Sequence, residues 1–292
     1  VVIGAGKTAI DACLWLLENG TDPDDICWIR PRDCWLLNRA QFQPGDAVVA
    51  VFGGIVKQLE AAAQSSDVDE WFDRCHAAEV FFRIDEAVRP TMIKGAMTNA
   101  AELEQLRRIT NVVRLGKVRR LAPDQIVLEE GTIPTTPDHL HVHCAAAGIS
   151  LAPPVPIFND GEIKLQGIRM VVPCFNAAFT GYIESTGRED AEKNRLCPPN
   201  AYPDTAIDWA RMLLMTMQTQ QLWTDPDVVQ WQENSRLNIT RGLLAHMDKP
   251  EMQTILQVFS ANIAPALEKL AGFTAHASGP ESERIFASAP AS

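Results

Sequence analysis

Three small residues at the start of the chain have the types and spacing of a phosphate-binding turn. Gly4, Gly6 and Ala9 form the pattern G-x-G-x-x-A, which follows the apolar residues 1–3 and precedes a helix-like apolar pattern. In such a turn Gly4 permits the sharp bend, Gly6 lets a pyrophosphate approach the backbone, and Ala9 lets helix and strand pack closely. The free N–H groups of the new helix then face the phosphates. The sequence therefore predicts a dinucleotide site here.

Two polar residues inside this turn are candidate contributors to the site. Thr8 offers a hydroxyl for a hydrogen bond, and Lys7 offers a positive charge, although lysine side chains are usually exposed and solvated. The alternative interpretation is a strand–helix–strand unit that binds nothing, in which the glycines serve the fold alone.

The residues after the second apolar segment indicate which dinucleotide is bound. Residues 26–29 predict a strand, and Arg30 stands where an NAD-binding unit usually has Asp or Glu for the ribose 2′-hydroxyl. An arginine fork suits a 2′-phosphate, and Arg32 is a second candidate for it. We therefore expect NADP, with NAD as the alternative. In that alternative Arg30 is surface charge and Asp33 accepts the ribose hydrogen bond.

Other chemistry-bearing residues give no site. His139, His141 and His143 alternate and would share one face of a strand, but no carboxylate or cysteine lies on that face nearby, so no metal site is expected. The cysteines are scattered without a C-x-x-C pair, which favours reduced thiols. The sequence has no nucleophile elbow, paired catalytic carboxylates or Walker-type loop, and no catalytic residue is identified.

The elements that must position these groups are those of an α/β protein. A helix over residues 8–19 joins the strands at 1–3 and 26–29 into one β-α-β unit, and residues 30–44 read as a long loop. Asn159-Asp160-Gly161 is a hairpin turn. Other helices are expected over residues 46–64, 69–84, 100–109, 176–185, 204–220 and onward to about 270, and short strands over 112–115, 117–121, 125–128 and 140–145.

A resemblance to a known family adds a function. Residues 4–11 resemble the second nucleotide-binding motif of flavin-containing monooxygenases and related NADPH-dependent flavoproteins, G-x-G-x-[ST]-[GA]-x-D. Residues 140–148 look like the strand and small-residue hinge with which those proteins leave the NADPH domain. The resemblance covers about residues 1–190 and is absent from the C-terminal third. It implies an NADPH domain inserted into a FAD domain, and hence a flavoprotein oxidoreductase.

Two motifs of that family are missing. The FAD-binding G-x-G-x-x-G and the F-x-G-x-x-x-H-type monooxygenase signature do not occur, and we expect both upstream of Val1. The chain has no initiator Met and begins inside a predicted strand, which also indicates a fragment of a longer protein. The expected organisation is a Rossmann-type NAD(P)-binding domain over 1–148, the C-terminal part of a FAD-type domain with an appended helical extension over 149–271, and a disordered tail over 272–292.

The expected function is that of the NADPH-binding portion of a FAD-dependent oxidoreductase acting on a small-molecule substrate, with monooxygenase chemistry left open by the resemblance. A net charge of −11 argues against nucleic acid as a partner. No apolar run reaches the ~18–20 residues of a transmembrane helix, and without a visible signal peptide we expect a cytoplasmic protein.

Two other functions stay open. A flavin-free NAD(P)-dependent dehydrogenase would need an acid–base pair such as Tyr–Lys, yet neither Tyr182 nor Tyr202 has a lysine four residues on. A nucleotide-sensing module without turnover would need no such pair.

Overall fold

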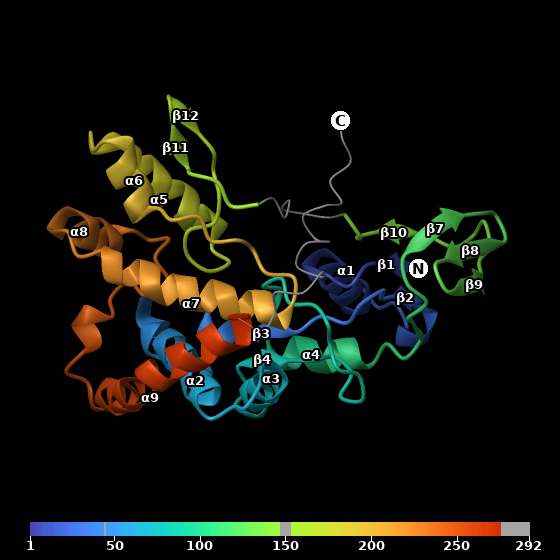
Figure 1. Ribbon diagram of the computed structural model, residues 1–292. Helices are drawn as coiled ribbons and strands as arrows, with labels where there is room; N and C mark the ends of the chain where they lie inside the picture. Colours follow the sequence, from blue (N-terminus) through green and yellow to red (C-terminus); the bar gives the residue numbers. More distant parts are fainter. Residues whose placement is uncertain (44, 147–152, 276–292) are drawn as a thin grey trace. The chain divides into compact units, whose positions relative to one another are not determined.

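A computed structural model describes residues 1–43, 45–146 and 153–275 of the chain. Its internal contacts divide the chain into two units. Figure 1 shows the helices and strands of both, coloured along the sequence. Unit 1 comprises Val1–Arg39 and Phe81–Gly148, and unit 2 comprises Ala40–Val80 and Ile149–Ser292. The sequence predicts one continuous domain over 1–148. By their contacts, residues 40–80 group instead with the second half of the chain.

Unit 1 is built on a parallel sheet with the strand order β10-β1-β2-β6. Val2 pairs with both Trp28 and Val142, so β1 is central. The helices α1 (Lys7–Glu18) and α4 (Ala100–Arg107) pack against each other beside it. β1 and β2 are apolar and fully buried, as strands covered on both faces should be. The sheet strands are β10 (Val142–His143), β1 (Val2–Ile3), β2 (Trp28–Ile29) and β6 (Val112–Val113).

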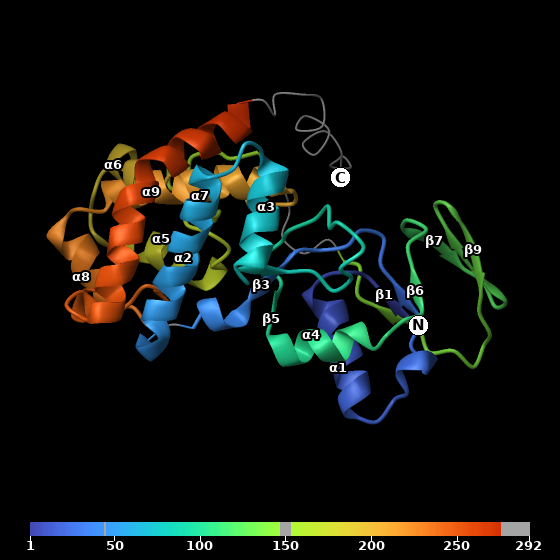
Figure 2. The same cartoon turned by 90° about the horizontal axis from the view of Figure 1, so that it is seen from below.

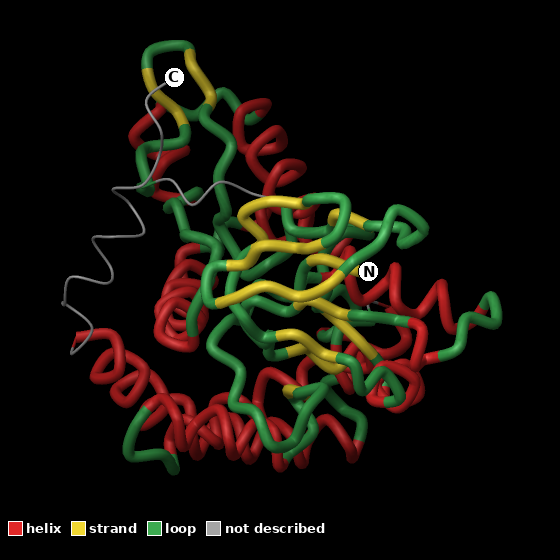
Figure 3. Tube along the Cα trace, turned by 90° about the vertical axis from the view of Figure 1, so that its right-hand side faces the viewer, coloured by secondary structure: helices red, strands yellow, loops and turns green. Residues whose placement is uncertain are grey.

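Two small three-stranded sheets complete unit 1, and all of their strands are short (Figure 3). In the first, β3 lies between β4, which is antiparallel to it, and β5, which is parallel to it. The second is an antiparallel meander. The strands are β3 (Leu36–Asn38), β4 (Phe81–Phe82) and β5 (Met97–Thr98), then β7 (Val118–Leu121), β8 (Gln125–Leu128) and β9 (Gly131–Pro134). The loop predicted over residues 30–44 is wrong at residues 36–38, which form the strand β3.

The long helix predicted over 69–84 is also wrong in its second half. α3 (Val68–Ala77) ends in a Schellman motif, with Glu79 at φ 56°. The Val80 N–H donates to the carbonyl of Cys75 at 2.9 Å, and the Glu79 N–H donates to that of His76 at 3.0 Å. This left-handed step stops the helix and releases the chain into β4.

Unit 2 is mainly helical. α2 (Val48–Ala63) packs along α9 (Pro250–Ala275), and α3 and α7 (Ala206–Leu222) contact this pair (Figure 2). The buried Gln58 joins three helices, because the indole of Trp71 donates to its carbonyl at 2.9 Å and that of Trp209 to its Oε1 at 3.0 Å. The remaining helices are α5 (Pro173–Ser185), α6 (Asp190–Leu196) and α8 (Pro226–Asn234), with 3₁₀ turns in both units at Pro23–Asp25, Arg39–Gln41, Gly45–Ala47 and Leu244–His246.

The hairpin predicted at residues 159–161 is confirmed. β11 (Phe158–Asn159) pairs antiparallel with β12 (Glu162–Ile163). Asp160 and Gly161 have φ of 44° and 79°, so both central turn residues are left-handed, as a tight hairpin turn requires.

The predicted tail is partly helical, because α9 runs to Ala275 and includes residues 272–275. Residues 276–292 of that tail, and residues 147 and 148 of the small-residue hinge, lie outside the described residues. The α/β class with a parallel sheet is confirmed. Within the described ranges, none of the helices combines the length and apolar character needed to cross a bilayer.

Candidate functional site

Gly4 is required by the fold itself. It directly follows β1 with φ +132°, a conformation that L side chains rarely adopt. A Cβ at this position would lie 2.6 Å from the carbonyl oxygen of Cys144, the residue after β10. Both the bend and the close approach of a neighbouring strand end therefore exclude a side chain.

Gly6 differs, because the surrounding chain does not demand a glycine there. Its φ of −86° is open to any residue, and a Cβ would meet no atom within 4 Å. Gly6 is the N-cap of α1, and it supplies no side-chain acceptor to the first helical turn, which also has no acidic residue. The first N–H groups of a helix need acceptors. Open space and the first N–H groups of α1 thus adjoin each other at this residue.

The other three residues predicted at the turn take different places. Ala9 is fully buried in the core cluster with Val2 and Trp28, so it has the packing role expected of it. Thr8 is exposed at the helix start. The Lys7 ammonium forms an ion pair with Asp11 one turn along the exposed face of α1.

Arg30 follows β2 as predicted, but it is a buried side chain. Only 3% of it is exposed, and its guanidinium lies 4.8 Å from the centre of the Trp28 ring. Its Nη1 is 3.1 Å from Asp33 Oδ1, while its buried Nε has no hydrogen-bond partner among the described residues. Burial lowers the pKa of Arg30 even though Asp33 opposes this shift. The sequence predicts a guanidinium that a ligand can reach. The structure shows a buried guanidinium with only some of its N–H groups hydrogen-bonded.

Asp33 is the centre of an ion-pair network that the sequence analysis missed. Arg114 donates to its two carboxylate oxygens at 2.7 and 3.2 Å, and also to Asp85 at 2.9 Å. The hydrogen bond to Asp33 is the main cause of the raised pKa of Arg114. With Arg30 and Arg114 on its oxygens, Asp33 is poorly placed to accept from a ribose.

The position of Arg114 in the sequence, directly after a strand, could have predicted this network. Arg114 follows β6 just as Arg30 follows β2, and both strands are parallel. The carboxyl ends of parallel strands meet at one edge of a sheet, where ligands of such folds bind. Gly4 ends β1 at the same edge.

A hollow of about 440 Å³ lies beside these arginines. Arg30, Arg107 and Arg114 line it together with Asp85 and Glu86. Arg107 donates to Glu86 and to Glu104, so much of the positive charge is already balanced. Arg30 thus lies at the edge of a hollow in which much of the charge is already paired.

Arg32 lies on a different set of contacts. Its Nη2 donates to the carbonyl oxygen of Thr91 at 2.8 Å and its Nε to the Thr91 hydroxyl at 3.3 Å. The side chain is half-buried. Arg32 is thus more accessible than Arg30 and meets neutral acceptors there.

The three alternating histidines do not converge on one point. His139 Nδ1 and His141 Nε2 both lie within hydrogen-bond distance of the Thr135 hydroxyl, at 3.0 and 2.9 Å, and His143 is exposed. Among the described residues no group of three or more His, Cys, Asp or Glu side chains is arranged to hold a metal ion.

Comparison with known proteins finds similarity without a described function. The chain is 40% identical over 275 residues to uncharacterized proteins of Mycobacterium bovis and of two Mycobacterium tuberculosis strains. The match covers 93% of this chain and 51% of each relative, so the chain spans about half the length of these curated relatives. No family model matches the sequence, and no solved structure matches it.

Proposed function

We propose that unit 1 binds NADPH and that the chain is the NADPH-binding portion of a FAD-dependent oxidoreductase. The contrast between Gly4 and Gly6 carries the proposal. Folding accounts for Gly4, whose Cβ would clash with the backbone of Cys144. Folding does not account for Gly6, whose Cβ would lie in open space at the start of α1. A pyrophosphate that needs this space and these N–H donors does account for it.

The sheet supports the same proposal. In chain order, its strands lie third, second, first and fourth across the sheet, with the glycine turn after the first. This is the order of a Rossmann-type half, in which the ligand binds at the carboxyl ends of the strands where the order reverses. Gly4 lies at this point, between β2 and β10.

The choice of NADP rests on the arginines at the same edge. Arg30 has a buried Nε without a partner and lines a hollow, and Arg32 is half-buried against Thr91. Both can add hydrogen bonds to a phosphate oxygen, and charge-assisted bonds of this kind are strong. The enclosure of Arg30 means that the phosphate has to enter the hollow rather than rest on an exposed fork.

The flavin part of the proposal rests on the resemblance of residues 4–11 to the flavin-containing monooxygenases. Bound NADPH would supply a hydride to the flavin of the whole protein. The residues of this chain would hold the pyrophosphate at Gly6 and the α1 N-terminus, and Ala9 would keep α1 against β1. No residue described here is assigned a catalytic role.

The test is a pair of substitutions at Gly6 in the intact protein. Gly6→Val puts a side chain into the pyrophosphate space and should weaken NADPH binding by about tenfold or more, measured by NADPH fluorescence titration. Gly6→Ser is the matched variant, because serine is a good N-cap and should not weaken α1. We expect Gly6→Ser to unfold like the wild type and still to bind NADPH less tightly. Wild-type affinity in both variants would show that the turn serves the fold alone.

A further inference from the structure

Arg169 is a buried charge without a counter-charge. Only 1% of its side chain is exposed, and within the described part of the chain no carboxylate pairs with it. Burial lowers its pKa to about 10, which leaves it positively charged at neutral pH. Buried charges are normally paired, because an uncompensated one is costly. The described chain therefore leaves the positive charge of Arg169 uncompensated, and a bound anion would compensate it.

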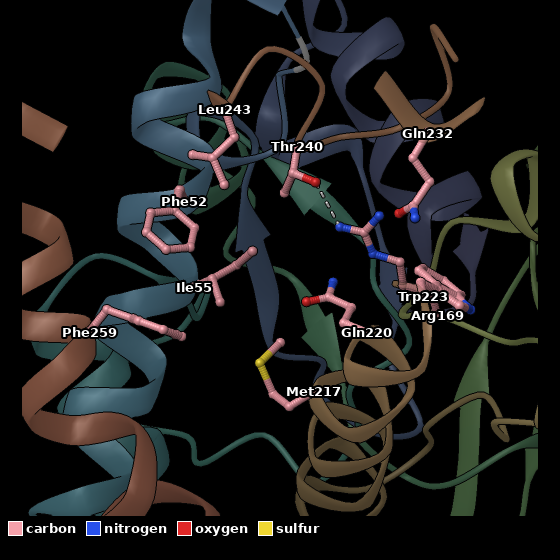
Figure 4. Close-up of a pocket in the computed structure, with 10 residues that line it drawn as sticks. All are labelled: Phe52, Ile55, Arg169, Met217, Gln220, Trp223, Gln232, Thr240, Leu243 and Phe259. Atoms are coloured by element: carbon pink, nitrogen blue, oxygen red, sulfur yellow. Dashed lines mark hydrogen bonds between the residues drawn. The ribbon is translucent and has the colours of Figure 1, made fainter. Parts of the chain in front are cut away.

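Neutral groups fix the orientation of this guanidinium. Nη1 donates to Asn238 Oδ1 at 2.8 Å. Nη2 donates to the Thr240 hydroxyl at 3.1 Å, the bond that is dashed in Figure 4. With its amide oxygen assigned from the hydrogen-bonding pattern, Gln220 accepts from Nη2 and Nε at 3.1 Å each. Below the guanidinium lies the Phe175 ring, 5.3 Å away. These contacts hold the charge in place without cancelling it.

The backbone at Arg169 is held as firmly as its side chain. The Arg169 N–H donates to Asn176 Oδ1 on α5, and the Met170 N–H donates to the Thr216 hydroxyl on α7, both at 3.1 Å. Met170 has φ 43°, an uncommon conformation for a residue other than glycine. The guanidinium is thus preorganised by two helices before any ligand arrives.

Arg169 lines a cavity of about 230 Å³ together with the polar residues Gln220, Gln232 and Thr240, and the remaining walls are apolar. Phe52, Ile55 and Leu243 lie across the cavity from the guanidinium in Figure 4. Met217 and Phe259 extend this apolar wall. Phe52, Leu243 and Phe259 are only half-buried, so the wall reaches the surface of unit 2. The cavity therefore has a cationic end and an apolar end.

The volume limits what this cavity can hold. An apolar cavity of ~150 Å³ accepts benzene, whereas pockets for drug-sized ligands begin near ~300 Å³. A cavity of about 230 Å³ falls between these values. Its ligand should be moderately larger than a benzene ring.

We infer that this cavity binds a small apolar carboxylic acid, with the carboxylate on Arg169 and the hydrocarbon body against Phe52, Ile55 and Leu243. The contacts with Asn238, Thr240 and Gln220 leave one Nη1 N–H of the guanidinium, which can donate a charge-assisted hydrogen bond to a carboxylate oxygen. One cation also balances one carboxylate charge, whereas a phosphate dianion would remain half-compensated. The inference uses unit 2 alone and does not depend on nucleotide binding by unit 1.

The experiment compares an acid with its neutral isostere. Phenylacetate and phenylacetamide are titrated into the intact protein, without nucleotide, by isothermal titration calorimetry. We expect the acid to bind at least about tenfold more tightly than the amide, because only the acid forms charge-assisted hydrogen bonds. Arg169→Met should abolish this difference, and Arg236→Met, which removes an exposed arginine, should retain it.

A second pair of variants decides the matter if Arg169→Met fails to fold. Leu243→Trp fills the apolar end of the cavity from its half-buried rim and should abolish phenylacetate binding. Leu244→Trp is the matched control, because Leu244 is 61% exposed and does not line the cavity. Equal affinities of wild type for acid and amide would overturn the inference. Unchanged phenylacetate binding in a folded Leu243→Trp protein would overturn it as well.

Discussion

The indole nitrogen of Trp28 donates a hydrogen bond to the carbonyl oxygen of Gly4 at 2.8 Å. Trp28 lies on β2 and is fully buried, while Gly4 ends the neighbouring strand β1. The bond satisfies a carbonyl group that has turned out of the strand. It also ties the glycine turn to the sheet next to Arg30, whose guanidinium lies over the same indole ring.

Trp28→Phe should destabilise unit 1. The variant loses the indole donor and leaves a buried carbonyl group unsatisfied, which costs about 1–3 kcal/mol, and the smaller ring leaves a cavity that adds to this cost. The free energy of unfolding in urea measures the effect. Trp15→Phe is the control, because Trp15 is 62% exposed and its replacement should change little. Equal losses in both variants would contradict the structural role of the Trp28–Gly4 bond.

Arg30→Ala should narrow the preference for NADPH over NADH. A charge-assisted hydrogen bond contributes ~1.5–3 kcal/mol, so its loss should weaken NADPH binding about tenfold or more. NADH has no 2′-phosphate, and its affinity should barely change. Arg32→Ala should act in the same direction, to an equal or lesser degree. The dissociation constants of both coenzymes, measured at fixed ionic strength, test this prediction.

Arg30→Asp should go further than Arg30→Ala, because it repels the phosphate and offers an acceptor to a ribose hydroxyl. Arg108→Ala removes an exposed arginine from the end of α4 and serves as the control for net charge. Wild-type protein that binds NADH as tightly as NADPH would refute Arg30 as the phosphate contact. So would an Arg30→Ala variant that loses both coenzymes equally.

Residues 1–292 produced alone should be colourless, and the intact protein should show flavin absorption. This follows from the proposed FAD-dependent oxidoreductase, because residues 1–292 contain no G-x-G-x-x-G motif for FAD. Visible spectra, with quantification of the FAD released on denaturation, provide the measurement. Stoichiometric FAD in the isolated residues 1–292 would contradict this prediction, and an intact protein without flavin would leave the flavin-free alternatives.

Glu70 should make unit 2 sensitive to acid. The backbone N–H of Ser66 and then its hydroxyl donate to Glu70 at 2.8 Å each, and with Arg74 they lower the pKa of Glu70 from its ordinary 4.5 to about 2. The folded protein therefore binds a proton at the Glu70 carboxylate less readily than the unfolded chain does. The contribution of Glu70 to the stability of the fold is complete above about pH 4.5 and is lost as the pH falls toward about 2. Urea unfolding across this range should show a shallower dependence in Glu70→Gln. Glu268→Gln, at an exposed position on α9, should retain the wild-type slope.

Elements whose cause is local were predictable from the sequence. β8 occupies residues 125–128 as expected, and Asn159-Asp160-Gly161 specifies its hairpin through turn chemistry alone. The strand β3 was missed because it depends on pairing with β4 and β5, more than forty residues away. The assignment of residues 40–80 to unit 2 likewise depends on helices that come much later in the sequence.

The candidate site was predictable to the same degree. The types and spacing of Gly4, Gly6 and Ala9 predict where they lie in the turn. Their positions depend on the local backbone conformation and on packing between neighbouring elements. Arg30 was expected to be accessible and is buried, since its environment depends on Trp28, Asp33 and the chain-distant Arg114. Arg169 carried no sequence motif, and its partners Asn238 and Thr240 lie some seventy residues later.

The packing of α2 along α9 has a consequence for synthesis on the ribosome. The chain emerges from its N-terminus, so the apolar face of α2 (Val48–Ala63) is made long before its partner α9 (Pro250–Ala275). At translation rates of roughly 5–20 residues per second, α2 waits on the order of ten seconds or more for this partner. During that interval Phe52, whose ring lies 5.5 Å from that of Phe259 in the folded protein, has no α9 to cover it. Nascent unit 2 should therefore be a client of chaperones that bind exposed apolar helices until the last turns of α9 leave the exit tunnel.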